Sequence, residues 1–190
     1  MMKRLLHSIA GLVAAGVVVA PATASAAEAP AGPQAFMAQS RAAGLTGEQA
    51  SWLQAEAERY LAAMGGKQVA PNRIDVDGRA EVSIALPGDA HPRDLSGRGA
   101  ATLAGPCDGG TAYRHFCAYQ HQFGTGTQID MFKCGAYPLP NWTDFGSWGN
   151  NQTRGTVAVF WGEFFQYDSN TAPSNDQSYD WNPVYTVFNC

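Results

Sequence analysis

The sequence predicts a mainly β protein whose C-terminal half, residues 107–190, folds as a small sandwich or barrel. Short candidate strands in this half are separated by Gly, Asn, Asp and Pro, which is typical of all-β domains with many turns. All four cysteines also lie there. One helix and one hairpin are predicted before it. The fold class is therefore mainly β, with a small N-terminal helix plus β-hairpin segment.

A repeat within the C-terminal half supports this fold class. Tyr119 and Phe123 end a short strand and its bend, and Phe160 and Phe164 do the same roughly 40 residues later. A repeat of this length indicates two copies of one β unit that share a core. No helical pattern separates the strands, which disfavours a parallel sheet. The candidate strands are Arg114–Tyr119, Thr127–Phe132, Gly155–Trp161 and Val184–Phe188.

Residues 1–26 have the pattern of a cleaved signal peptide. Lys3 and Arg4 supply the positive start, an apolar run extends from Leu5 to Ala20, and Ala24-Ser25-Ala26 gives the small-residue cleavage signature. The apolar run is too short and too rich in Ala and Gly for a membrane span. We expect a secreted, extracellular protein with no membrane segment in its mature form.

The charge of the mature chain disfavours nucleic-acid partners. Loss of Lys3 and Arg4 lowers the basic residues from 12 to 10 against 16 acidic residues, a net charge of about −6. Such a chain repels phosphate backbones. The mature length suffices for one good core with a small appendage, and we expect a monomer.

Residues 27–44 are predicted to be a flexible leader, because their first part is rich in Ala, Pro and Gly. The segment 45–88 follows and begins with a helix, for which Thr46 and Gln49 form a capping box. Apolar residues then recur at helical spacing until Gly65-Gly66 ends the run. These residues are Leu53, Ala57, Tyr60, Leu61 and Met64.

A hairpin completes this segment. Asp77-Gly78 lies between two runs of alternating apolar residues, which is the strongest short hairpin signal. Residues 89–106 are rich in Gly, Ala, Pro and Arg without periodicity, so they are predicted to be a linker at a domain boundary. One helix and one hairpin are marginally stable alone. We expect them to pack against the rest of the chain or to act as a pro-segment.

The cysteines indicate disulfides. An even number in an exported chain most simply means two bridges, and four cysteines allow three connectivities. We favour Cys107–Cys117, which closes a short loop, and Cys134–Cys190, which ties down the C-terminus. Zinc is the rival interpretation, but the chain has no Cys-x-x-Cys pair and no histidines at ligand spacing.

Several of these motifs resemble a known family. The arrangement of Cys107 and Cys117-Ala118-Tyr119, the bend to Phe123-Gly124, and the run Ser147–Thr153 resemble the secreted actinobacterial proteins of peptidase inhibitor family I36. The type member of that family is a Streptomyces metalloproteinase inhibitor. Residues 68–88 also look like the leaders of such proteins.

The resemblance implies a fold and a function for residues 107–190. It implies a βγ-crystallin-like sandwich of two Greek-key motifs, with a Cys107–Cys117 bridge beside the first motif. It also implies a secreted proteinaceous inhibitor of an extracellular peptidase, with a metallopeptidase as one candidate target. Such an inhibitor acts by non-covalent loop insertion and needs neither a catalytic residue nor a cofactor, so we do not expect an enzyme.

An inhibitor needs a rigid, exposed loop that is already ordered before it binds. The best candidate follows Cys134, because two prolines fix the backbone and three apolar side chains offer anchors. The alternative is a structural loop whose aromatic rings cover one end of the sandwich. The residues of the candidate inhibitory loop are Tyr137, Pro138, Leu139, Pro140 and Trp142.

Calcium binding is an alternative function. βγ-crystallin domains bind calcium through carbonyl, carboxylate, amide and hydroxyl oxygens, which are the ligands that this ion prefers. Asp144, Ser147 and Asn150 loosely match such a site. The second hydroxyl residue of the usual site is missing, because Trp148 follows Ser147. Asparagines of this kind are also common in turns.

Carbohydrate binding is the other alternative, since exposed tryptophan rings stack on sugars. Four tryptophans are candidates, although large aromatics also form the core of small sandwiches. Core placement is favoured for Trp161, which lies on an apolar strand. The candidates are Trp142, Trp148, Trp161 and Trp181.

Catalysis has the weakest support in the sequence. Potential acid and base groups are present, but no nucleophile, zinc or phosphate-loop motif accompanies them. These groups are His115, His121, Asp130, Asp144 and Glu163.

Overall fold

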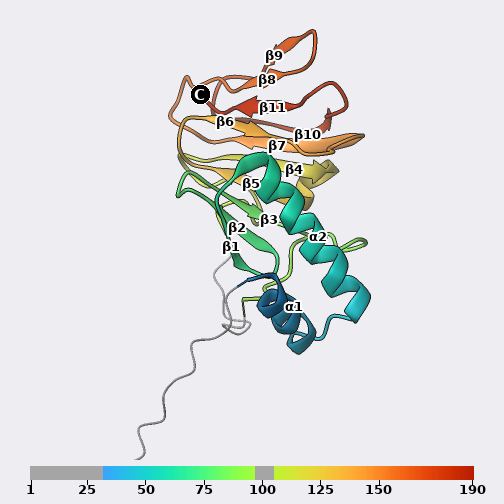
Figure 1. Ribbon diagram of the computed structural model, residues 1–190. Coiled ribbons are helices and arrows are strands. Elements are labelled where there is room, and N and C mark those ends of the chain that lie inside the picture. The colour runs from blue at the N-terminus through green and yellow to red at the C-terminus, as the bar shows by residue number, and fades with distance from the viewer. Residues whose placement is uncertain (1–31, 97–104) are drawn as a thin grey trace, which may run out of the picture.

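The computed structural model describes residues 32–96 and 105–190, and the signal peptide predicted over residues 1–26 lies outside this part of the chain. The described residues form two antiparallel β-sheets and two α-helices (Figure 1). The fold is therefore mainly β, as predicted. No helix in the described part of the chain has the length and hydropathy of a membrane span.

Sheet A is the larger sheet, with its strands in the order β1-β2-β3-β5-β4-β7-β10. Its strands are β1 (Lys67–Ala70), β2 (Arg73–Val76), β3 (Ala80–Ser83), β4 (Phe116–His121), β5 (Thr125–Met131), β7 (Phe145–Asn150) and β10 (Ser174–Asp180). A short 3-10 turn, η1 (Gln122–Gly124), joins β4 to β5.

Sheet B has its strands in the order β6-β11-β8-β9. They are β6 (Ala136–Pro138), β8 (Val159–Trp161), β9 (Gln166–Asp168) and β11 (Thr186–Phe188). The strands from β4 to β11 thus form two consecutive groups of four. In each group the third strand lies in the other sheet: β6 joins sheet B and β10 joins sheet A. Main-chain hydrogen bonds therefore tie each group to the other.

Helix α2 (Gly47–Met64) begins at the predicted capping box. Gln49 N donates to Thr46 Oγ1 at 3.1 Å, and Thr46 N donates to Gln49 Oε1 at 3.0 Å. The helix ends before Gly65, whose φ of 73° suits glycine. Leu53 and Tyr60 of the predicted apolar stripe are buried, so the helix packs its predicted face inward.

The predicted hairpin is also confirmed. Strands β2 and β3 meet at Asp77 and Gly78, whose φ values are 52° and 61°. Two consecutive positive φ angles define the turn type that favours Asp-Gly between twisted strands. Gly78 N also donates to Asp75 Oδ1 at 2.7 Å, so a side chain of strand β2 stabilises the turn.

Pairing of β3 with β5 places the hairpin in the same sheet as the C-terminal strands. Val82 lies opposite Ile129, and both belong to one hydrophobic core with Leu53 of α2 and Phe160 of β8. The boundary predicted at 89–106 therefore does not separate two cores. Its composition marks a loop, but composition does not tell whether the strands on either side pair.

Helix α1 (Pro33–Ala42) lies within the segment predicted as a flexible leader, residues 27–44. Pro33 is placed at the start of the helix, where its fixed φ fits and its missing N–H costs nothing. The helix contacts α2, and Ser40 is buried. The predicted flexible leader therefore extends beyond the Ala-, Pro- and Gly-rich residues on which the prediction rests.

Strands β1, β6, β7, β9 and β10 are not among the predicted strands, because they lack apolar alternation. Strand β10 is polar along its length and lies at the edge of sheet A. Strand β7 contains Gly146 and Gly149, where a side chain would overlap Trp181 and Thr111 respectively. These strands form because neighbouring elements pair and pack with them, which local sequence does not show.

The strand register corrects the predicted repeat by one residue. Tyr119 lies opposite Ser147 in the β4–β7 pair, and Trp161 lies opposite Thr186 in the β8–β11 pair. Tyr119 and Trp161 both face away from the sandwich core, whereas Phe160 fills it. Tyr119 is therefore equivalent to Trp161, and the predicted match with Phe160 is wrong.

The favoured disulfides are both present, Cys107–Cys117 and Cys134–Cys190, with Cα separations of 5.7 and 5.4 Å. The described residues include no free cysteine. Two disulfides are compatible with an extracellular protein, because such bridges persist in oxidising compartments.

Each disulfide can be removed by a pair of serine substitutions. A bridge restricts the unfolded chain more when it closes a longer loop. The sequence separations are 10 and 56 residues, so Cys107→Ser/Cys117→Ser should cost about 3 kcal/mol and Cys134→Ser/Cys190→Ser about 4 kcal/mol. Denaturant unfolding measures both, and a larger loss for the shorter loop would contradict the expectation.

Tyr60→Phe tests how firmly α2 is bound to the sandwich. Trp142 Nε1 donates to Tyr60 Oη at 2.7 Å in the core. Loss of the hydroxyl leaves a buried N–H without a partner, which should lower the unfolding free energy by about 1–3 kcal/mol. Tyr113→Phe is the matched control, since Tyr113 is exposed. Equal stability of the two variants would show that this contact does not hold the helix.

Candidate functional site

The predicted inhibitory loop does not present its apolar side chains to solvent. Tyr137, Leu139 and Trp142 are buried in the sandwich core, and Pro138 and Pro140 are half-buried. Tyr137 lies on β6, which pairs with β11. The Tyr137, Leu139 and Trp142 side chains hold the fold together and are not available to a partner in the folded protein. The structural alternative stated for this segment is the one that the burial supports.

The candidate calcium ligands do not converge. Asp144 is exposed before β7, while Ser147 and Asn150 lie on β7 three residues apart and so project from opposite faces. Ser147 Oγ donates to His121 O at 2.8 Å and accepts from Gly124 N at 2.9 Å. The Asn150 amide is buried and hydrogen-bonded. The Ser147 hydroxyl therefore stabilises the bend between β4 and β5, and the Asn150 amide stabilises the chain at the end of β7.

Three of the four candidate sugar-stacking tryptophans are buried: Trp142, Trp148 and Trp181. Trp161 is the exposed one, which reverses the prediction for that residue. Its strand is apolar, but consecutive side chains on a strand point to opposite faces, so only one of the Phe160 and Trp161 rings can face the core. Phe160 takes that position.

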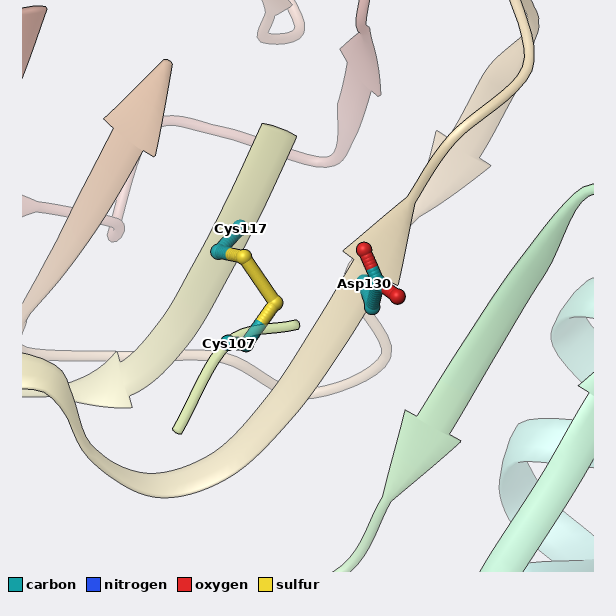
Figure 2. A group of neighbouring side chains, drawn as sticks. All are labelled: Cys107, Cys117 and Asp130. Atoms are coloured by element: carbon teal, nitrogen blue, oxygen red, sulfur yellow. A yellow bond between two sulfur atoms is a disulfide. The ribbon is translucent and has the colours of Figure 1, made fainter. Parts of the chain in front are cut away.

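Asp130 lies beside the Cys107–Cys117 disulfide on the outer face of sheet A (Figure 2). The two sulfurs and the carboxylate are close enough for a metal site, but the sulfurs are bonded to each other and offer no thiolate ligand. His115 Nδ1 lies 2.6 Å from Asp130 Oδ1. This pair joins β5 to the residue that precedes β4.

Burial raises the pKa of Asp130 above its ordinary value, while the contact with His115 lowers it and Glu81 on β3 raises it. The other candidate acid and base groups are exposed and lie on different elements. His121 is at the opposite end of β4 from His115, and Glu163 is in the β8–β9 turn. Of the five candidate groups, the structure therefore brings together His115 and Asp130 and leaves the other three apart.

Four exposed aromatic side chains gather on the β8–β9 hairpin, at one end of the molecule (Figure 1). We call residues 161–167 the β8–β9 finger. Phe164 at its turn is 79% exposed, and strand β9 is exposed along its whole length at the edge of sheet B. The exposed aromatic residues of the finger are Trp161, Phe164, Phe165 and Tyr167.

Aromatic rings cover both faces of the finger. Trp161 lies on the face away from the core, with its ring centroid 6.0 Å from that of Phe188. Tyr167 lies opposite Phe160 in the register and therefore on the other face, where its ring is 5.9 Å from that of Phe165. A hairpin with exposed rings on both faces can contact two walls of a partner at once.

The turn of the finger is fixed by the backbone. Gly162 N donates to Phe165 O, and Tyr185 N donates to Trp161 O, both at 2.8 Å. A side chain at Gly162 would overlap the Pro183 carbonyl. The finger is therefore ordered before any partner binds.

Sequence reasoning missed this site, although a signal for it was available. Phe164 and Phe165 are consecutive and follow Gly162-Glu163, a combination that favours a turn. Two large apolar side chains in a tight turn cannot both enter the core. Their exposure could therefore have been predicted, whereas the outward face of Trp161 depends on the strand register.

No model of a known protein family matches the chain, and no significant match was found among curated proteins or solved structures. The site must therefore be interpreted from its own residues.

Asp130→Asn should change the pH dependence of stability. Between the ordinary aspartate pKa of about 3.9 and the raised pKa of Asp130, the native state keeps a proton that the unfolded chain has lost. The unfolding free energy therefore falls as pH rises through this interval. The Asn variant should lack this fall. Urea unfolding at a series of pH values measures it, with exposed Asp168→Asn as control, and parallel curves for Asp130→Asn and wild type would contradict it.

Proposed function

We propose that the protein is a secreted, non-enzymatic inhibitor of an extracellular peptidase that inserts the β8–β9 finger into the peptidase's active-site cleft. The observation that supports this most is the arrangement of exposed rings on both faces of the finger and at its turn. Binding to a flat partner surface would require exposed rings on only one face of the hairpin. A cleft has two walls and a floor, and the finger offers a ring to each.

The order of the finger supports tight binding. Association costs less free energy when the binding segment has one conformation beforehand. The turn hydrogen bond of Gly162 and the pairing of β8 with β11 supply that order. Hot spots of binding are enriched in large aromatic side chains near the centre of the interface. Phe164 has that position at the turn.

The charge of the finger favours a metallopeptidase as target. Glu163 is its one charged residue and lies beside Phe164. A carboxylate is favoured in a cleft that holds a cation, and an apolar specificity pocket would accept the Phe164 ring. The resemblance to peptidase inhibitor family I36 supports the same target class.

We also propose that residues 107–190 form a βγ-crystallin-like pair of Greek-key motifs. The exchange of β6 and β10 between the sheets supports this, because each group of four strands then contributes its third strand to its neighbour. The helix–hairpin segment extends one of these sheets at β5. A fold of this kind does not itself specify an activity.

The test is titration of the purified protein against a thermolysin-like metallopeptidase and a subtilisin-like serine peptidase. We expect stoichiometric inhibition of the metallopeptidase. Phe164→Ala should raise the inhibition constant about 30-fold, the effect of removing a hot spot worth about 2 kcal/mol. Phe145→Ala is the matched control, since it removes an exposed ring from β7.

Two outcomes would overturn the proposal. One is the absence of inhibition of both peptidases at micromolar excess. The other is inhibition by Phe164→Ala that equals wild type. Substitution of Leu139 is not an informative test, because this side chain is buried and its loss would destabilise the fold.

A further inference from the structure

A concave surface lies on the outer face of sheet A, and none of its lining residues belongs to the finger. The cleft has a volume of about 710 Å³, within the range of small-ligand sites. Cys107 and the run Gly109–Thr111 line one wall, and Ser174, Asn175 and Gln177 of β10 line the other. Gly149 of β7 lies in the floor, and the bend at Phe123 forms one end. We call it the outer cleft.

The first wall is held in one position by buried contacts. The disulfide fixes Cys107 to β4, and Tyr119 Oη lies 2.8 Å from Cys107 O and 3.2 Å from Gly110 O. Asn151 Nδ2 donates to Thr111 O at 2.8 Å. Thr111 also packs on Gly149, where any side chain would displace it. The wall is therefore formed before a ligand arrives.

The opposite wall offers free hydrogen-bonding groups. Asn175 and Gln177 of β10 are exposed and line the cleft, and within the described residues their side-chain amides have no hydrogen-bond partner. Each amide is both a donor and an acceptor. Gln122 Nε2 donates to Ser178 Oγ at 2.6 Å, which ties this wall to the β4–β5 bend.

An exposed aromatic ring completes the cleft. Phe123 is 70% exposed and has a φ of 58°, a left-handed conformation that is uncommon for a bulky side chain. Its ring could be buried by a ligand lying in the cleft. A backbone held in this conformation costs free energy, and such residues cluster at functional sites.

The lining is neutral. The described residues that line the cleft include one histidine, His91, and no Asp, Glu, Lys or Arg. Burial raises the pKa of Tyr119 to about 12, so its hydroxyl keeps its proton under physiological conditions. Amides, hydroxyls and an aromatic ring, without charge, are the groups that recognise sugar hydroxyls and the apolar faces of sugar rings.

We propose that the outer cleft binds a neutral oligosaccharide, through the Asn175 and Gln177 amides and the Phe123 ring. This site is separate from the β8–β9 finger and does not depend on the proposed inhibition. It would retain the secreted protein on a glycan surface while the finger remains free.

The test is an NMR titration of the isotope-labelled full-length mature protein with the tetramers of β-1,4-linked glucose, xylose and N-acetylglucosamine. We expect saturable binding of at least one of them, with a Kd on the order of 1 mM or tighter. The shifted amide signals should include Gly109, Gly110 and Asn175. Asn175→Ala and Phe123→Ala should each raise the Kd at least about 10-fold, the equivalent of 1.4 kcal/mol.

Controls separate this site from the finger and from misfolding. Phe164→Ala should bind the tetramer as wild type does, and the far-ultraviolet circular dichroism of all variants should be unchanged. No binding of any neutral tetramer at about 10 mM would overturn the proposal. Binding that both cleft variants retain, or binding of acidic oligosaccharides alone, would overturn it as well.

Discussion

The contact between Trp142 and Trp181 is the interaction on which the rest of the structure depends. Their rings meet edge to face at 5.7 Å, inside the core. Trp142 donates its Nε1–H to Tyr60 of α2, and Trp181 donates to the Tyr119 carbonyl of β4 at 2.9 Å. One ring pair therefore joins the helix, sheet A and the loops that precede β7 and β11, without leaving a buried polar atom unpaired.

This constraint decides which aromatic residues remain for function. The core takes the rings of Trp142, Trp148 and Trp181, so these rings are not available to a partner. The rings of the finger have no place in the core and remain exposed. The outer cleft arises for a related reason, since the absence of a side chain at Gly149 lets the disulfide-bound wall approach sheet A beside β10. Both candidate sites are therefore consequences of how the core is filled.

The sequence predicts those structural features that depend on residues close together along the chain. The Thr46 capping box and the Asp77-Gly78 turn are local, so both are found where predicted. Strand β10 is polar and forms only because β7 is beside it. The faces of Phe160 and Trp161 follow from register, which one strand does not reveal. A second repeat in the sequence agrees with the observed register: Trp142 and Ser147 recur as Trp181 and Thr186 with the same spacing.

Hydroxyl-radical footprinting of the native protein, read by mass spectrometry, tests the central claim most directly. That claim divides the aromatic residues into core rings and exposed rings. Trp161 and Phe164 should be oxidised readily, while Trp142 and Trp181 should stay protected until the protein unfolds. Rapid oxidation of Trp142 together with protection of Phe164 would contradict the account, because the loop after Cys134 would then be exposed and the finger buried.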